Sequence, residues 1–114
     1  MEVTIYHNPR CSKSRQALSL LESKGNKPIV VEYLKNPLTT EQLSRIINEL
    51  NIKPIDLVRK NESIWKENYK GKELSDDELV EAMISNPKLI ERPIVTSSKG
   101  TVVGRPPENV LRVL

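Results

Sequence analysis

The first third of the chain passes from a strand pattern to a helix pattern and back to a strand pattern. Residues 2–6 form a short apolar run without clean alternation, which is typical of an interior strand. Residues 12–24 carry apolar side chains at helical spacing, and Gly25 ends that pattern. Residues 28–34 form a second run rich in β-branched side chains. This order predicts one βαβ unit with parallel strands and a right-handed crossover.

The middle of the chain has helix signals instead. Two capping boxes, Thr39 with Gln42 and Ser75 with Glu78, predict the starts of two helices. Pro54 suits the first turn of a short helix between them. Residues 61–69 have only a weak pattern, and their expected anchors in the core are Ile64, Trp65 and Tyr69.

The last part of the chain returns to strands. Residues 94–96 and 101–103 predict a hairpin, and a final helix is expected to end near Leu114. The order β-α-β, helices, β-β-α predicts an α/β protein with a thioredoxin-like fold and a four-stranded mixed sheet. We expect residues 1–114 to form a single domain that carries a helical insertion at about 38–88.

Composition excludes several classes of protein. The chain is 37% hydrophobic and 29% charged, which is typical of a soluble globular domain. Its net charge of +3 comes from interspersed charges, and only 4% of residues are aromatic, so nothing favours a nucleic-acid binder. One cysteine allows neither an intramolecular disulfide nor a Cys-rich zinc site. We expect no metal, no signal peptide and no membrane span, and therefore a cytoplasmic protein.

Cys11, the only cysteine, stands at the predicted strand-to-helix turn. The unpaired N–H groups and the positive dipole end of a helix start favour a thiolate over a thiol. A buried, unreactive cysteine is the competing interpretation. Ser14 makes the motif Cys-x-x-Ser, so no second thiol in the chain can resolve an oxidised Cys11.

Three polar neighbours of Cys11 each allow two interpretations. His7, the only histidine, either stabilises the thiolate as an imidazolium or hydrogen-bond donor, or ends the strand and bonds the loop. Asn8 and Ser14 either donate to the sulfur or to an oxyanion, or cap the turn.

Three arginines follow apolar runs or precede prolines, close to where predicted elements end. They are Arg59, Arg92 and Arg105. An arginine side chain binds tetrahedral oxyanions with a planar fork that never loses its charge, although most arginines are only solvated surface groups. Arg92-Pro93, directly before a strand, also suggests a cis peptide bond.

The stretches 7–15 (HNPRCSKSR), 91–95 (ERPIV) and 104–108 (GRPPE) occur in this order across the chain. Together they resemble the glutaredoxin-linked arsenate reductase family, known as ArsC-like proteins. The chain is most similar to a shorter subgroup of arsenate-reductase-like proteins. It has Ser12-Lys13 where the best-known members have Gly-Thr, and it stops at Leu114 where they have a longer tail.

The resemblance implies a thioredoxin-like fold and a cytoplasmic arsenate reductase that binds no cofactor, uses glutathione as co-substrate and works with glutaredoxin. It places the nucleophile at Cys11, the oxyanion-binding arginines at Arg59, Arg92 and Arg105, the thiolate-favouring histidine at His7 and the cis-proline at Pro93. We expect a monomer that binds neither nucleic acid nor membrane. A transcription regulator with the same fold, or a thiol reductase acting on another substrate, remains an alternative.

Overall fold

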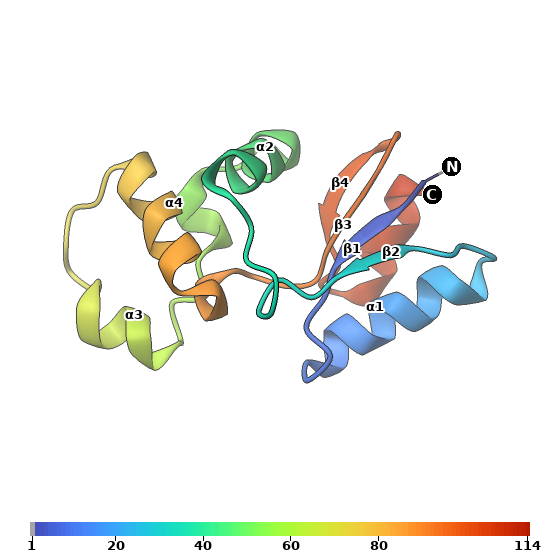
Figure 1. Cartoon of the computed structure of the whole chain (residues 1–114), viewed down its shortest axis with the longest axis horizontal. Coiled ribbons are helices and arrows are strands. Elements are labelled where there is room, and N and C mark those ends of the chain that lie inside the picture. The colour runs from blue at the N-terminus through green and yellow to red at the C-terminus, as the bar shows by residue number, and fades with distance from the viewer. Residues whose placement is uncertain (1) are drawn as a thin grey trace. The chain divides into compact units, whose positions relative to one another are not determined.

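The computed structural model describes residues 2–114 and contains one four-stranded mixed sheet (Figure 1). Its strands are β1 (Thr4–Tyr6), β2 (Ile29–Val31), β3 (Ile94–Ser97) and β4 (Gly100–Val103). The strand order is β2-β1-β3-β4, with β1 parallel to β2 and antiparallel to β3, and β3 antiparallel to β4. The predicted parallel βαβ unit, the interior position of the first strand and the hairpin are confirmed.

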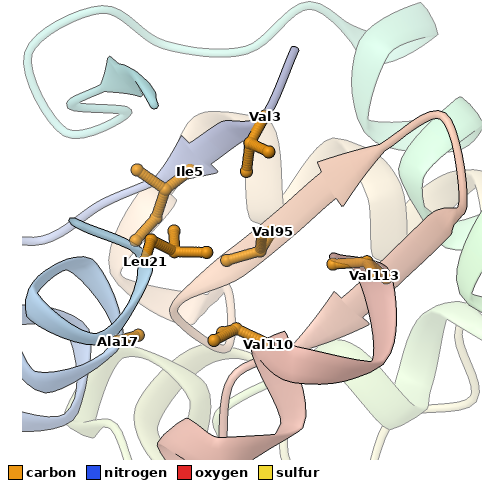
Figure 2. Close-up of a cluster of buried hydrophobic side chains, with 7 residues drawn as sticks. All are labelled: Val3, Ile5, Ala17, Leu21, Val95, Val110 and Val113. Carbon is orange, nitrogen blue, oxygen red and sulfur yellow. The ribbon is translucent and has the colours of Figure 1, made fainter. Parts of the chain in front are cut away.

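Two helices pack on one face of this sheet. They are α1 (Ser12–Ser23) and the 3-10 helix η3 (Pro107–Val113). Figure 2 shows Ala17 and Leu21 of α1 and Val110 of η3 converging on the sheet residues Ile5 and Val95, all fully buried. Burying each of the larger of these side chains contributes about 1.5–3 kcal/mol, so this cluster holds α1 firmly against the strand that precedes it.

The final helix is present as predicted, but it is a 3-10 helix. Its buried residues Pro107, Val110 and Val113 are three positions apart. In a 3-10 helix, side chains at i and i+3 lie in one row, so this spacing directs all three onto the core.

The second strand is shorter than predicted. Residues 28–34 were expected to be extended, but pairing stops at Val31. The carbonyl of Glu32 accepts hydrogen bonds from the N–H groups of Lys35 and Asn36, at 3.0 and 2.9 Å. The chain therefore turns at Glu32 instead of continuing along β1.

Backbone contacts divide the chain into two compact units. The first contains the sheet and consists of the residues up to Asn36 together with Arg92–Leu114, and the second is Pro37–Glu91. The second unit corresponds closely to the insertion predicted at about 38–88, while the single domain stays a prediction. Its helices are α2 (Thr40–Leu50), η1 (Pro54–Leu57), α3 (Ser63–Asn68), α4 (Asp76–Ser85) and η2 (Pro87–Leu89). Both predicted capping boxes and the proline at the start of η1 are present.

Helix α3 was not expected, because residues 61–69 have no clear periodicity. Trp65 is buried and stacks on Tyr69 four residues later, with ring centroids 5.6 Å apart. Such an i, i+4 aromatic pair stabilises a single helical turn that propensity alone would not predict. Within residues 2–114, no helix combines the length and apolar character needed to cross a membrane.

Gly104 is packed so tightly beside Pro93 that even a methyl group does not fit. A Cβ atom at position 104 would lie 2.9 Å from Cγ of Pro93 and 3.2 Å from Cγ1 of Val110. We expect Gly104→Ala to lower the free energy of unfolding by about 1–3 kcal/mol, the usual cost of overpacking a core. Urea unfolding measures this loss. Ser19→Ala, on the exposed face of α1, is the control and should change stability by less than about 0.5 kcal/mol.

Candidate active site

One end of the sheet gathers the loops that carry the predicted site residues of the first unit (Figure 1). Tyr6, at the end of β1, pairs with Val31 on one side and with Ile94 on the other, and Ile94 pairs with Val103. These four residues form one row across the sheet. Four segments extend from this row at the same end of the sheet: 7–11, 32–35, 92–93 and 104–106. The strand register therefore brings Cys11, Arg92 and Arg105 to a common edge.

Cys11 is the N-cap residue of α1 and is 9% exposed. Burial raises the pKa of its thiol, but the backbone N–H of Ser14, the guanidinium of Arg92, the backbone N–H of Lys13 and the guanidinium of Arg105 together outweigh burial. The net result is a pKa below the ordinary value for cysteine. The N–H groups of Lys13 and Ser14 belong to the first turn of α1, where the unpaired N–H groups and the helix dipole favour a negative charge. These effects favour the reactive interpretation of Cys11 over the inert one.

Arg92 and Arg105 both act on Cys11 from the β3–β4 side of the sheet end. Arg92 is half-buried, with its Nε atom fully buried, and Arg105 is exposed. Each precedes a cis proline. The cis bond at Pro93 was expected and is confirmed, whereas the one at Pro106 was not expected. The site therefore offers one partly buried and one exposed cation to an anion that approaches the sulfur.

His7 and Ser14 form a buried pair that fixes the loop. Their Nδ1 and Oγ atoms are 2.6 Å apart, and Ser14 Oγ accepts the N–H of Asn8 at 3.0 Å. Burial lowers the pKa of His7, Glu32 opposes this effect and Arg15 adds to it. A neutral ring at pH 7 lets the Ser14 hydroxyl donate to Nδ1, an assignment inferred from this bonding pattern. These contacts favour the loop-bonding interpretation of His7 over the imidazolium.

Asn8 and Ser14 also act within the turn. Oδ1 of Asn8 accepts the N–H of Arg10 at 3.0 Å, and the carbonyl of Asn8 accepts the N–H of Cys11 at 3.0 Å. Ser14 is 0% exposed, so its hydroxyl does not reach an anion in solution. Both side chains shape the loop that presents Cys11.

Arg59 belongs to the second unit. Its Nη1 donates to the carbonyl of Lys88 at 3.1 Å and lies 3.5 Å from the carboxylate of Glu62. The positions of the two units relative to one another are not determined, so the part of Arg59 in the oxyanion site stays a prediction.

Arg15 has a role in this loop that the motif alone does not predict. Its Nη1 donates to the carbonyl of Pro9 at 2.9 Å. The guanidinium thus fastens the loop to the first turn of α1. The signal was available, because a long side chain at N4 can reach back over the turn that precedes it. Among residues 2–114, no cluster of three or more His, Cys, Asp or Glu side chains is placed to hold a metal ion.

The lowered pKa of Cys11 predicts a specific pH dependence. We expect the rate of alkylation by iodoacetamide to reach half its maximum at a lower pH in the folded protein than in the same protein unfolded in urea, because the pKa of Cys11 is lowered in the fold. Because the pKa is lower in the folded state, thiolate formation stabilises the fold fully above the unfolded pKa, and this stabilisation is lost as pH falls through the folded pKa. The free energy of unfolding of the native protein should therefore fall relative to that of Cys11→Ser as pH is lowered through the folded pKa of Cys11. An alkylation midpoint in the folded protein at or above that of the unfolded protein would contradict the activated thiolate.

Comparison with known proteins agrees with this geometry. Residues 6–113 match the family model described as the ArsC family. The chain belongs to the ArsC family. Among ArsC-family relatives, it is 42% identical to an arsenate reductase of Haemophilus influenzae, over 100% of both chains. It is 44% identical to the uncharacterized protein YfgD of Escherichia coli K12, over 99% of this chain and 97% of the relative.

The fold of this ArsC-family chain also matches a solved structure. It is similar to an arsenate reductase from Vibrio cholerae, with a TM-score of 0.95 and 46% identity. That match covers 100% of this chain and 98% of the other. The thioredoxin-like α/β architecture expected from the motifs is therefore confirmed.

Proposed function

We propose that this ArsC-family protein reduces arsenate to arsenite, with Cys11 as the nucleophile. One observation carries the proposal: two guanidinium groups, Arg92 and Arg105, act on the sulfur of a helix-capping cysteine whose pKa is lowered. Positive charge fixed beside a thiolate suits an oxyanion substrate, because it attracts the anion and compensates the charge that develops during attack. The relatives from Haemophilus influenzae and Vibrio cholerae, both named arsenate reductases, support the choice of arsenate.

In the first step, the Cys11 thiolate attacks arsenic and forms a sulfur–arsenic bond. One arsenate oxygen takes up protons and leaves as water, and arsenic remains in the +5 state. Arg92 and Arg105 hold the remaining oxygens by charge-assisted hydrogen bonds. Covalent catalysis of this kind divides a difficult reduction into two easier steps.

In the second step, an external thiol attacks the sulfur of Cys11. The sulfur–arsenic bond breaks, its electron pair stays on arsenic, and arsenite leaves in the +3 state. Cys11 is then in a mixed disulfide, which a further thiol must reduce. Because Cys11 is a lone cysteine in a Cys-x-x-Ser motif, both thiols come from outside the chain. We assign these roles to glutathione and glutaredoxin.

The proposal includes three further points. Arg59 binds the oxyanion with Arg92 and Arg105, which the arginine-rich chemistry of the site supports. The protein acts in the cytoplasm, which its free thiol supports. It works as a monomer, since one chain already supplies the nucleophile and two of the cations.

The test is to measure arsenite produced by the native protein with arsenate, glutathione and glutaredoxin, leaving out each component in turn. We expect turnover only with the complete mixture. Phosphate should inhibit in competition with arsenate, because it has the same shape and charge but is not reduced. If the folded protein with a titratable Cys11 makes no arsenite, the substrate assignment is wrong. Reduction of a different substrate, or copurification with a transcription complex, would then explain the site instead.

A further inference from the structure

A small groove lies beside the loop that carries Cys11. It has a volume of about 230 Å³ and is formed by two segments that extend from the same end of the sheet. Its lining residues, which define the loop–turn groove, are Asn8, Pro9, Arg10, Glu32, Leu34 and Lys35. The carbonyl of Asn8 accepts the N–H of Cys11 at 3.0 Å, so one wall is continuous with the backbone that presents the sulfur.

The groove combines an apolar lining with a charged rim. Leu34, a large hydrophobic side chain that is 38% exposed, and Pro9 supply apolar surface. Arg10 and Lys35 contribute two positive charges and Glu32 one negative charge, so the rim has a net charge of +1. Glu32 and Lys35 lie 3.7 Å apart, but the Lys35 side chain is 76% exposed. Exposed ion pairs are weak, so both groups can turn toward a ligand at little cost.

The chemistry of Cys11 creates a need for a ligand at this place. On the proposed function, the adduct is cleaved by a thiol from outside the chain, and that thiol must reach the sulfur. Whatever carries the thiol then lies against the surface next to Cys11. Arg92 and Arg105 approach the sulfur from the β3–β4 side, whereas the loop–turn groove lies on the β2 side, next to Arg10.

We propose that the loop–turn groove is the binding site for the external thiol that cleaves the adduct, which on the proposed function is the short anionic peptide thiol glutathione. The inference rests on the proposed function and identifies where its co-substrate binds. Carboxylates of the peptide pair with Arg10 and Lys35, an ammonium group pairs with Glu32, and apolar methylene groups cover Leu34. The volume is below the roughly 300–1,000 Å³ of pockets that enclose drug-sized ligands, so a few residues fit with their ends in solvent.

Bound in this way, the peptide thiolate attacks the Cys11 sulfur. A sulfur–sulfur bond forms, the sulfur–arsenic bond breaks, and the two electrons of that bond reduce arsenic from +5 to +3. The two sulfur atoms, one from the peptide thiol and one from Cys11, together lose these two electrons and end in the mixed disulfide.

Thiol–disulfide exchange tests the groove without arsenate. We would measure the rate at which Cys11 reacts with oxidised glutathione, which carries carboxylates and ammonium groups, and with neutral hydroxyethyl disulfide. The ratio of the two rates cancels any change in the thiolate fraction of Cys11. We expect the native protein to prefer oxidised glutathione. In the double variant Arg10→Gln, Lys35→Gln this preference should fall roughly three- to tenfold, as for the loss of two exposed ion pairs.

The matched control is Lys24→Gln, Lys27→Gln, which removes the same charge from exposed positions of the same unit outside the groove. It should keep the native preference. An equal loss in the control, or an unchanged ratio in the groove variant, would overturn the proposal. Since exchange involves no arsenate, an intact preference in a protein that makes no arsenite would reject the proposed function and keep the groove. Conversely, a protein that reduces arsenate but shows no preference for oxidised glutathione would reject the groove and keep the proposed function.

Discussion

A Cys11→Ser variant is expected to reduce no arsenate above the rate measured without protein. The serine hydroxyl remains protonated under conditions that ionise Cys11, so it does not attack arsenic. An arsenate ester of the serine oxygen would also not be reduced, because the second step requires oxidation of a sulfur atom to a disulfide. Arsenite formation in the coupled glutathione and glutaredoxin assay measures the loss.

Two controls separate lost chemistry from lost binding. Ser12→Ala changes an exposed neighbour and should retain activity. Arg92 and Arg105 remain in the Cys11→Ser variant, so arsenate should still raise its melting temperature. Residual turnover above background by Cys11→Ser would show that another group is the nucleophile.

Periodicity was sufficient to predict the framework of the site. The apolar run at 2–6, the helix that follows and the hairpin near the end specify which strands pair, and pairing determines which loops share an end of the sheet. Cys11 and the two arginines of the first unit meet because Tyr6, Ile94 and Val103 lie in one row. The capping boxes of the second unit were equally predictable, since each depends on two side chains only three positions apart in the sequence.

Features that depend on tertiary contacts were not predictable in this way. The short β2 ends because the Glu32 carbonyl is used in a turn, and α3 depends on the stacking of Trp65 on Tyr69. The loop–turn groove requires two segments that only the folded sheet brings together. The sequence does not determine the protonation state of His7 either, because its pKa depends on burial and on the charges of Glu32 and Arg15.

Arg92→Gln is expected to lower kcat/KM for arsenate by about 10²–10³, the usual effect of removing one preorganised donor from an oxyanion site. Arg92 is half-buried, so water screens its interaction with the oxyanion less than it would at an exposed position. The same guanidinium lowers the pKa of Cys11, so the alkylation midpoint of Arg92→Gln should move to higher pH. Steady-state kinetics and the alkylation profile measure the two effects separately.

The conservative variant distinguishes charge from geometry. Arg92→Lys retains the positive charge and should keep most of the shift in the pKa of Cys11, but it loses the planar fork that binds two oxygens at once. Its kcat/KM should therefore lie between those of the native protein and Arg92→Gln. Arg112→Gln, an exposed arginine of η3, is the control for net charge and should behave like the native protein. If Arg92→Gln alters neither the Cys11 pKa nor arsenate kinetics, Arg92 is a surface cation and the oxyanion site lies elsewhere.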